Sequence, residues 1–137
     1  MDYNYYRTLI AVADDCPLRA SKVPEGRGGK KSIAQIQYEM LAGHPYEYTQ
    51  EDVLFHTWLE RQDIPKSESD IAGLRAAFFS KPQACLRTSP LAKKYGWGLV
   101  FDEQGRIALC PMESAQYRDL LDGGKVKVVK AMRSKRA

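Results

Sequence analysis

The alternation of apolar and polar residues predicts strands near both ends of the chain and a hairpin in its second half. Tyr5 to Ala13 is rich in aromatic and β-branched residues and contains neither Gly nor Pro, which is typical of a strand. Residues 97–102 alternate large and small or polar side chains, and 106–110 alternate again after a turn at 102–105 whose glycine supplies a positive φ. Lys125 to Val128 alternates lysine with valine, as an outer strand does.

Between these strands apolar residues recur every three or four positions, which predicts helices. Ser32 and Thr49 are placed as N-caps, and Asp52 three residues after Thr49 completes a capping box. Ser89 before Pro90 is another helix start, because proline suits the first helical position. The helices are expected from Ser32 to about Ala42, from Thr49 to about Gln62, after a cap at Ser67 or Ser69 through Phe78, from Ser89 to Tyr95, and from Glu113 to Leu121. The apolar face of the second helix is expected to be Leu54, Phe55, Trp58 and Leu59.

This order of elements predicts an α+β fold rather than a doubly wound parallel sheet, because the helices are grouped beside an antiparallel hairpin. The 137 residues fit one domain, 1–137, with helices packed on a small antiparallel sheet that includes the 97–110 hairpin. Neither an internal repeat nor a low-complexity segment interrupts this pattern.

The charge of the chain is divided unevenly between its body and its end. The formal net charge is +4. Residues 125–137 carry six cations and no carboxylate, whereas residues 1–124 hold 15 Lys and Arg against 17 Asp and Glu, a net of −2. A near-neutral globule with a basic end predicts a non-enzymatic binding or interaction module that contacts an acidic partner or nucleic acid. The cations expected to make that contact are Lys130, Arg133, Lys135 and Arg136. The alternative is that the lysines guard an open sheet edge and the rest is solvated.

Three cysteines with wide spacing give no disulfide framework. The first residues lack the basic and apolar regions of a signal peptide, and no apolar run approaches the roughly 20 residues that span a bilayer. We therefore expect a cytoplasmic protein that does not enter the membrane.

A glycine-rich basic stretch before Ser32 is the first candidate anion site. It fails the phosphate-loop motif, because Lys31 follows Gly29-Lys30 and the required first glycine falls on Pro24. Free amides at the start of the next helix could still hold an anion with Arg27, Lys30 and Lys31 nearby. The alternative is a solvated loop.

The second candidate lies between residues 85 and 98, where polar and aromatic side chains are densest. Arg87, Ser89 and Lys93 could bind a small anion in a cleft, and neighbouring cations could favour a thiolate at Cys85. This makes a small-molecule anion-binding protein, or an enzyme with a cleft near Cys85, Arg87 and Lys93, the alternative function. The competing interpretation is structural, with Ser89 as a helix cap. Homo-oligomerisation through an open sheet edge is a third option.

Metal and cofactor chemistry receive little support from the sequence. His44 and His56 are the only histidines, and no cysteine pair has the close spacing of zinc ligands. No serine lies in a nucleophile elbow. We expect neither a metal nor a cofactor.

Several short stretches resemble a known family. They are Tyr5-Tyr6, Asp15-Cys16-Pro17, Gln37 to Leu41, Pro45 to Val53, Cys85-Leu86-Arg87, Ser89-Pro90-Leu91, Tyr95 to Gly98 and Lys130 to Arg136. The chain is similar, over most of its length and including its basic ending, to small bacterial proteins classed as a domain of unknown function. The resemblance implies no activity, cofactor or catalytic residue.

Overall fold

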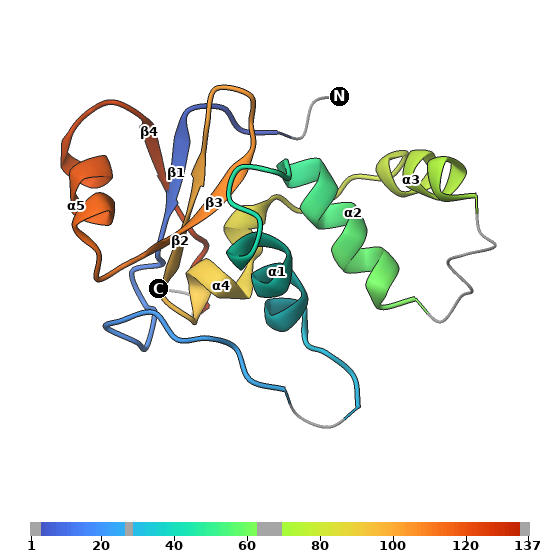
Figure 1. Cartoon of the computed structure of the whole chain (residues 1–137), viewed down its shortest axis with the longest axis horizontal. Coiled ribbons are helices and arrows are strands. Elements are labelled where there is room, and N and C mark those ends of the chain that lie inside the picture. Colours follow the sequence, from blue (N-terminus) through green and yellow to red (C-terminus); the bar gives the residue numbers. More distant parts are fainter. Residues whose placement is uncertain (1–3, 27–28, 63–69, 135–137) are drawn as a thin grey trace.

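The computed structural model of the chain contains five helices and a four-stranded sheet within the residues that it describes, 4–26, 29–62 and 70–134 (Figure 1). This is the α+β class predicted from the sequence. In chain order the elements are β1 (Thr8–Ala11), α1 (Ile33–Ala42), α2 (Gln50–Glu60), α3 (Ile71–Phe79), the 3-10 turn η2 (Leu86–Thr88), α4 (Pro90–Lys93), β2 (Trp97–Phe101), β3 (Ile107–Pro111), α5 (Ala115–Asp122) and β4 (Lys127–Lys130).

The sheet has the strand order β3-β2-β1-β4 and is mixed rather than wholly antiparallel. β2 and β3 form the predicted hairpin, and β1 pairs antiparallel with β2. β4 pairs parallel with β1, with Thr8 opposite Lys127 and Ala11 opposite Lys130. The parallel pair arises because α5 carries the chain from β3 across one face of the sheet, so that β4 runs in the same direction as β3. β4 is one of the two edge strands, as the alternation of lysine and valine predicts, although it begins at Lys127 and not at Lys125.

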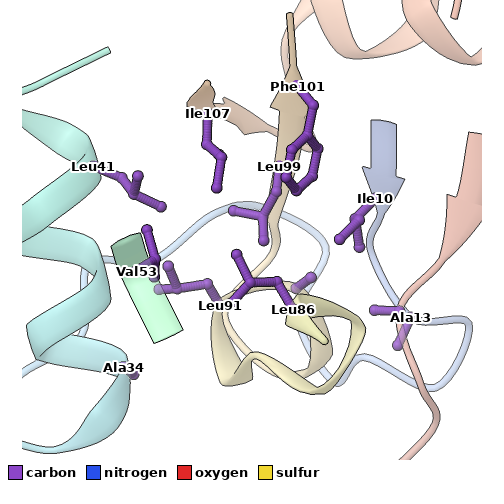
Figure 2. Close-up of a cluster of buried hydrophobic side chains, with 12 residues drawn as sticks. Ile10, Ala13, Ala34, Leu41, Val53, Leu86, Leu91, Leu99, Phe101 and Ile107 are labelled. Carbon is purple, nitrogen blue, oxygen red and sulfur yellow. The ribbon is translucent and has the colours of Figure 1, made fainter. Parts of the chain in front are cut away.

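The sheet is covered on both faces, with α5 on one side and α1, α2 and α4 on the other (Figure 1). Successive residues of β1 therefore enter different cores, because side chains alternate across a strand. Ile10 faces the helices α1, α2 and α4 together with Leu99 and Phe101, and Figure 2 shows these side chains converging there. Leu9 belongs to the smaller cluster on the α5 side. This double coverage explains why all four residues of β1 are buried.

The predicted starts of three helices are confirmed. Ser32 and Thr49 each form a capping box, and the Ser89 hydroxyl accepts from the amide of Leu91. The predicted caps of the third helix, Ser67 and Ser69, lie outside the described residues. α3 is capped instead by Asp70, whose carboxylate accepts from the amide of Gly73 at 3.0 Å.

The buried face of α2 differs from the prediction at two positions. Phe55 and Leu59 are buried as expected, but Leu54 and Trp58 are only partly buried. Val53 and Thr57 take their place inside, since these residues face α1 and the sheet. Leu54 and Trp58 face a cavity described below. None of the helices in the described part of the chain combines the length and the apolar character needed to cross a membrane.

Candidate functional site

The glycine-rich candidate site is not assembled in the described residues. Arg27 lies outside them, and Lys30 is exposed to solvent. Lys31 forms an ion pair with Glu39, and this contact raises the pKa of the Lys31 ammonium. Ser32 and Gln35 cap each other, which occupies two of the amides at the start of α1. The structure therefore gives less support than the sequence does to an anion bound at the start of α1.

Cys85 lies beside an aromatic hydroxyl. The Tyr5 hydroxyl donates to the Cys85 sulfur at 3.4 Å. Burial, followed by this contact, raises the pKa of Tyr5 to about 12, so the phenol stays protonated at neutral pH. The two histidine rings lie against Tyr48, with centroid distances of 5.6 Å for His44 and 6.4 Å for His56. The contacts of Cys85 thus supply a weak proton donor and not the base that a nucleophilic thiol needs.

Arg87 holds the end of the chain to the body. Its Nε donates to the carbonyl of Lys130 at 2.6 Å, and its own carbonyl accepts from the amide of Met132 at 2.8 Å. In the ladder of β4 the Lys130 carbonyl points away from β1, so Arg87 covers part of the outer edge of the sheet. Lys93 lies half-buried in the last turn of α4. These two hydrogen bonds give Arg87 a structural role that needs no bound anion.

Two of the four described cations of the basic C-terminal segment, Lys130 and Arg133, are matched by an acidic group of the body. Lys130 contacts the Asp14 carboxylate at 2.8 Å, Arg133 lies 3.8 Å from its other oxygen, and the amide of Ser134 donates to Asp15 at 2.9 Å. The hydrogen bond from Lys130, followed by its charge, lowers the pKa of Asp14. Lys135 and Arg136 lie outside the described residues. The positive charge available to an external partner is thereby smaller than the sequence predicts.

A cavity of about 310 Å³ lies between α1, α2, the end of α3 and the segment 83–90. Its volume is at the lower end of the range for small-molecule sites. Of the predicted site residues that the structure describes, Ser89 alone lines it. The lining residues are Ile33, Gln37, Leu54, Thr57, Trp58, Arg61, Gln62, Phe78, Gln83, Ala84, Leu86, Thr88, Ser89 and Pro90.

Three buried polar side chains form one wall of this cavity. The Ser89 hydroxyl donates to Oε1 of Gln37 at 2.6 Å, and Nε2 of Gln37 donates to the Thr57 hydroxyl at 3.4 Å. Thr57 in turn donates to the carbonyl of Val53 at 2.6 Å. Ser89, Gln37 and Thr57 are 3%, 4% and 7% exposed. We call this chain of hydrogen bonds the polar relay; it joins the start of α4 to α1 and α2.

Another part of the cavity lining is aromatic. The rings of Trp58 and Phe78 lie 5.4 Å apart, and both contact the buried ring of Phe55. Gln83 fixes this wall, because its side-chain amide donates to the carbonyl of Phe78 at 2.8 Å. Apolar walls with a few convergent polar groups are the usual composition of ligand sites.

Among the described residues that line the cavity there is no carboxylate and one guanidinium, that of Arg61. Arg61 is exposed at the C-terminal end of α2. None of the ion pairs found among the described residues involves it. Residues 1–124 carry a net charge of −2, but the described lining of this cavity is positive through Arg61, which favours an anion at this place.

The residues Gln37 and Thr57 were not singled out by sequence reasoning, although the pattern contains a signal for them. Gln37 falls four positions after Ile33 and four before Leu41, so it occupies the apolar stripe of α1. A polar residue in such a stripe must find a buried partner, which marks it for attention. Ser89 was predicted as an anion-binding candidate and as a cap. The structure confirms the cap.

The described residues include no group of three His, Cys, Asp or Glu side chains that could hold a metal ion. No curated protein and no solved structure matches the chain. The family that its motifs resemble is confirmed by a match over residues 1–137. The protein belongs to DUF6157, a family of unknown function.

Proposed function

We propose that this protein binds a small organic anion with an apolar body in the cavity between α1, α2 and segment 83–90. The observation that carries the proposal is the combination of aromatic side chains with the exposed Arg61 in a lining whose described residues include no carboxylate. Trp58 and Phe78 supply apolar surface, whereas Arg61 supplies the charge. Binding of a small anion was also expected from the sequence, but at Arg87 and Lys93. The proposed site is instead the neighbouring cavity, which those two residues do not line.

The polar relay supports a ligand that also accepts a hydrogen bond. The Gln37 amide carries two N–H groups, and its contact with Thr57 engages only one of them. A ligand oxygen in the cavity could accept from the other. The relay also keeps the Gln37 amide oriented, because Ser89 donates to its carbonyl oxygen.

Binding without catalysis is the interpretation that the contacts of the cavity favour. The Ser89 hydroxyl donates to an amide oxygen, which is too weak a base to activate it as a nucleophile. Contact of the basic C-terminal segment with an acidic partner stays a prediction, and the pairing of Asp14 with Lys130 and Arg133 makes it the weaker proposal. The unpaired state of Cys16, Cys85 and Cys110 supports a reducing compartment such as the cytoplasm.

The test is a titration with hexanoate and with its neutral counterpart hexanamide, followed by tryptophan fluorescence. The chain has two tryptophans, and Trp97 lies elsewhere, with its indole N–H donating to the carbonyl of Lys22 at 2.9 Å. Trp97→Phe therefore leaves Trp58 as the reporter of the cavity wall. At roughly 0.5 kcal/mol per heavy atom, hexanoate should bind with a Kd of about 1 mM.

Charge recognition is tested by Arg61→Gln. We expect hexanoate binding to weaken roughly three- to tenfold, as befits a partly exposed ion pair, while hexanamide binding stays unchanged. Arg118→Gln is the matched control, since Arg118 is an exposed arginine on α5, on the other face of the sheet. The proposal is refuted if hexanoate gives no saturable change at about ten times the expected Kd, or if both arginine variants behave alike.

A further inference from the structure

Helix α3 is apolar yet only partly covered. Seven of the nine residues in its sequence IAGLRAAFF are Ala, Ile, Leu or Phe, and none of them is buried. Ile71 at its start is 37% exposed. An isolated exposed apolar residue is ordinary, but a helix that is apolar around most of its circumference is normally buried. Figure 1 shows α3 at the edge of the molecule, beyond α2 and away from the sheet.

A second hollow lies along this helix. It has a volume of about 340 Å³ and shares Trp58, Phe78 and Gln83 with the first cavity. The remaining wall consists of Leu74, Ala77, Ser80 and Lys81. The two hollows therefore adjoin each other at the paired rings of Trp58 and Phe78, which we call the aromatic ridge.

The second hollow has the same electrostatic character as the first. The described residues of its lining include no carboxylate and one ammonium group, that of Lys81. Together the two hollows form a largely apolar surface around the aromatic ridge, with Arg61 contributing to one hollow and Lys81 to the other. This surface is complementary to an elongated anionic amphiphile rather than to a compact polar molecule.

We infer that the ligand is an unbranched carboxylic acid of about ten carbons, whose head lies near Arg61 and whose tail crosses the Trp58–Phe78 ridge into the hollow along α3. The inference rests on the proposed function and names its ligand class. An alkyl tail would cover the exposed apolar face of α3 and release the water on it.

An alkyl chain suits this surface better than a peptide does. A peptide carries an N–H and a C=O at almost every residue, and these groups need partners when they leave water. In the second hollow Leu74, Ala77 and Phe78 have no polar side-chain atom. The Ser80 hydroxyl and the Gln83 amide already donate to the carbonyls of Ala77 and Phe78. Methylene groups have no such requirement, and their flexibility allows a bend across the ridge.

The experiment is isothermal titration calorimetry of the full chain with hexanoate, octanoate and decanoate at fixed ionic strength. Each fully buried methylene should tighten binding about fourfold, and each half-covered one about twofold. We expect decanoate to bind at least about 15-fold more tightly than hexanoate. Affinity that levels off at hexanoate would overturn the inference.

Two neighbouring alanines of α3 provide a matched pair of variants. Ala77→Trp should fill the second hollow and remove most of the decanoate advantage, while hexanoate binds as before. Ala76→Trp adds the same side chain at an exposed position that lines neither hollow, and it should change neither affinity. Equal losses in the two variants would overturn the inference.

Other outcomes separate the two proposals. If hexanoate binds but decanoate gains nothing, the small-anion function survives and the elongated ligand does not. If hexanoate does not bind, both fall. Light scattering of the unliganded protein distinguishes a different occupant: a dimer that Ala77→Trp dissociates would show that a second copy covers α3, and it would overturn the inference.

Discussion

Replacing Ser89 by alanine tests the polar relay directly. Ser89 is 3% exposed, and its hydroxyl makes two contacts: it accepts from the amide of Leu91 at 3.2 Å and donates to Oε1 of Gln37 at 2.6 Å. Alanine removes both without adding bulk. The change leaves the buried Gln37 oxygen without this donor and α4 without its cap.

The expected cost follows from these two losses. A missing N-cap destabilises by about 1 kcal/mol, and a buried acceptor left without its donor costs about 1–3 kcal/mol. Ser89→Ala should therefore lower the free energy of unfolding by about 2–4 kcal/mol. For a chain of this length that corresponds to a fall in Tm of roughly 6–12 °C. Thr88→Ala is the matched control, because the Thr88 hydroxyl is exposed and donates only to the carbonyl of Cys85.

The assay is urea and thermal unfolding followed by circular dichroism, extended to a double-mutant cycle with Gln37→Leu. Each single variant orphans the other partner, but the double variant removes both groups. We expect the double variant to be less destabilised than the sum of the singles by about 1–3 kcal/mol. Strict additivity, or a Thr88→Ala variant as unstable as Ser89→Ala, would refute the relay.

The remaining predictions concern packing and the anchored C-terminal segment. Gly98→Ala should destabilise the protein by about 1–3 kcal/mol in urea unfolding, because the added Cβ would lie 2.9 Å from the ring of Tyr117. Gly29→Ala is the control. It should change the stability by less than about 0.5 kcal/mol, because a Cβ at this position meets no atom within 4 Å. The pKa of Asp14 is lowered, chiefly by the hydrogen bond from Lys130. The contribution of this carboxylate to the stability of the folded protein is therefore present above the unfolded pKa of about 3.9, and it is lost as the pH falls through the lower folded pKa. NMR titration should show the Asp14 carboxyl returning toward its ordinary pKa in Lys130→Met; an unchanged pKa would show that this contact does not form in solution.

Local chemistry made much of the fold predictable. Ser32 and Thr49 satisfy helix amides with their own neighbours, and Gly105 supplies a positive φ of 78° to the hairpin turn. Such signals operate within a few residues and need no knowledge of the rest of the fold. The predicted cap of α3 was wrong because Ser67, Ser69 and Asp70 are all good N-cap residues, and the local sequence does not show which of them begins the helix.

The parallel pairing of β4 with β1 was harder to predict. Its register joins Thr8 to Lys127, which are far apart in the sequence. The alternation of lysine and valine indicates an outer strand but says nothing of its neighbour or direction. Charge pairing is hard to predict for the same reason. Composition shows that the segment is basic, but it does not show that Lys130 pairs with Asp14, which lies 116 positions away.

The candidate site was predictable only at Ser89, and the reason lies in how the cavity is built. Its walls come from α1, α2, α3 and segment 83–90, so no local motif contains it. The sequence does contain one irregularity in each of two amphipathic helices. In α1 the polar Gln37 occupies the apolar stripe. In α2 Leu54 and Trp58 widen the apolar stripe beyond the part that α1 and the sheet cover. A buried polar residue and a surplus of apolar surface on adjacent helices both require a further partner. In this fold Gln37 has hydrogen-bond partners in the polar relay. The apolar side chains of Leu54 and Trp58 have no comparable cover and line the cavity, which is the physical reason to expect a ligand there.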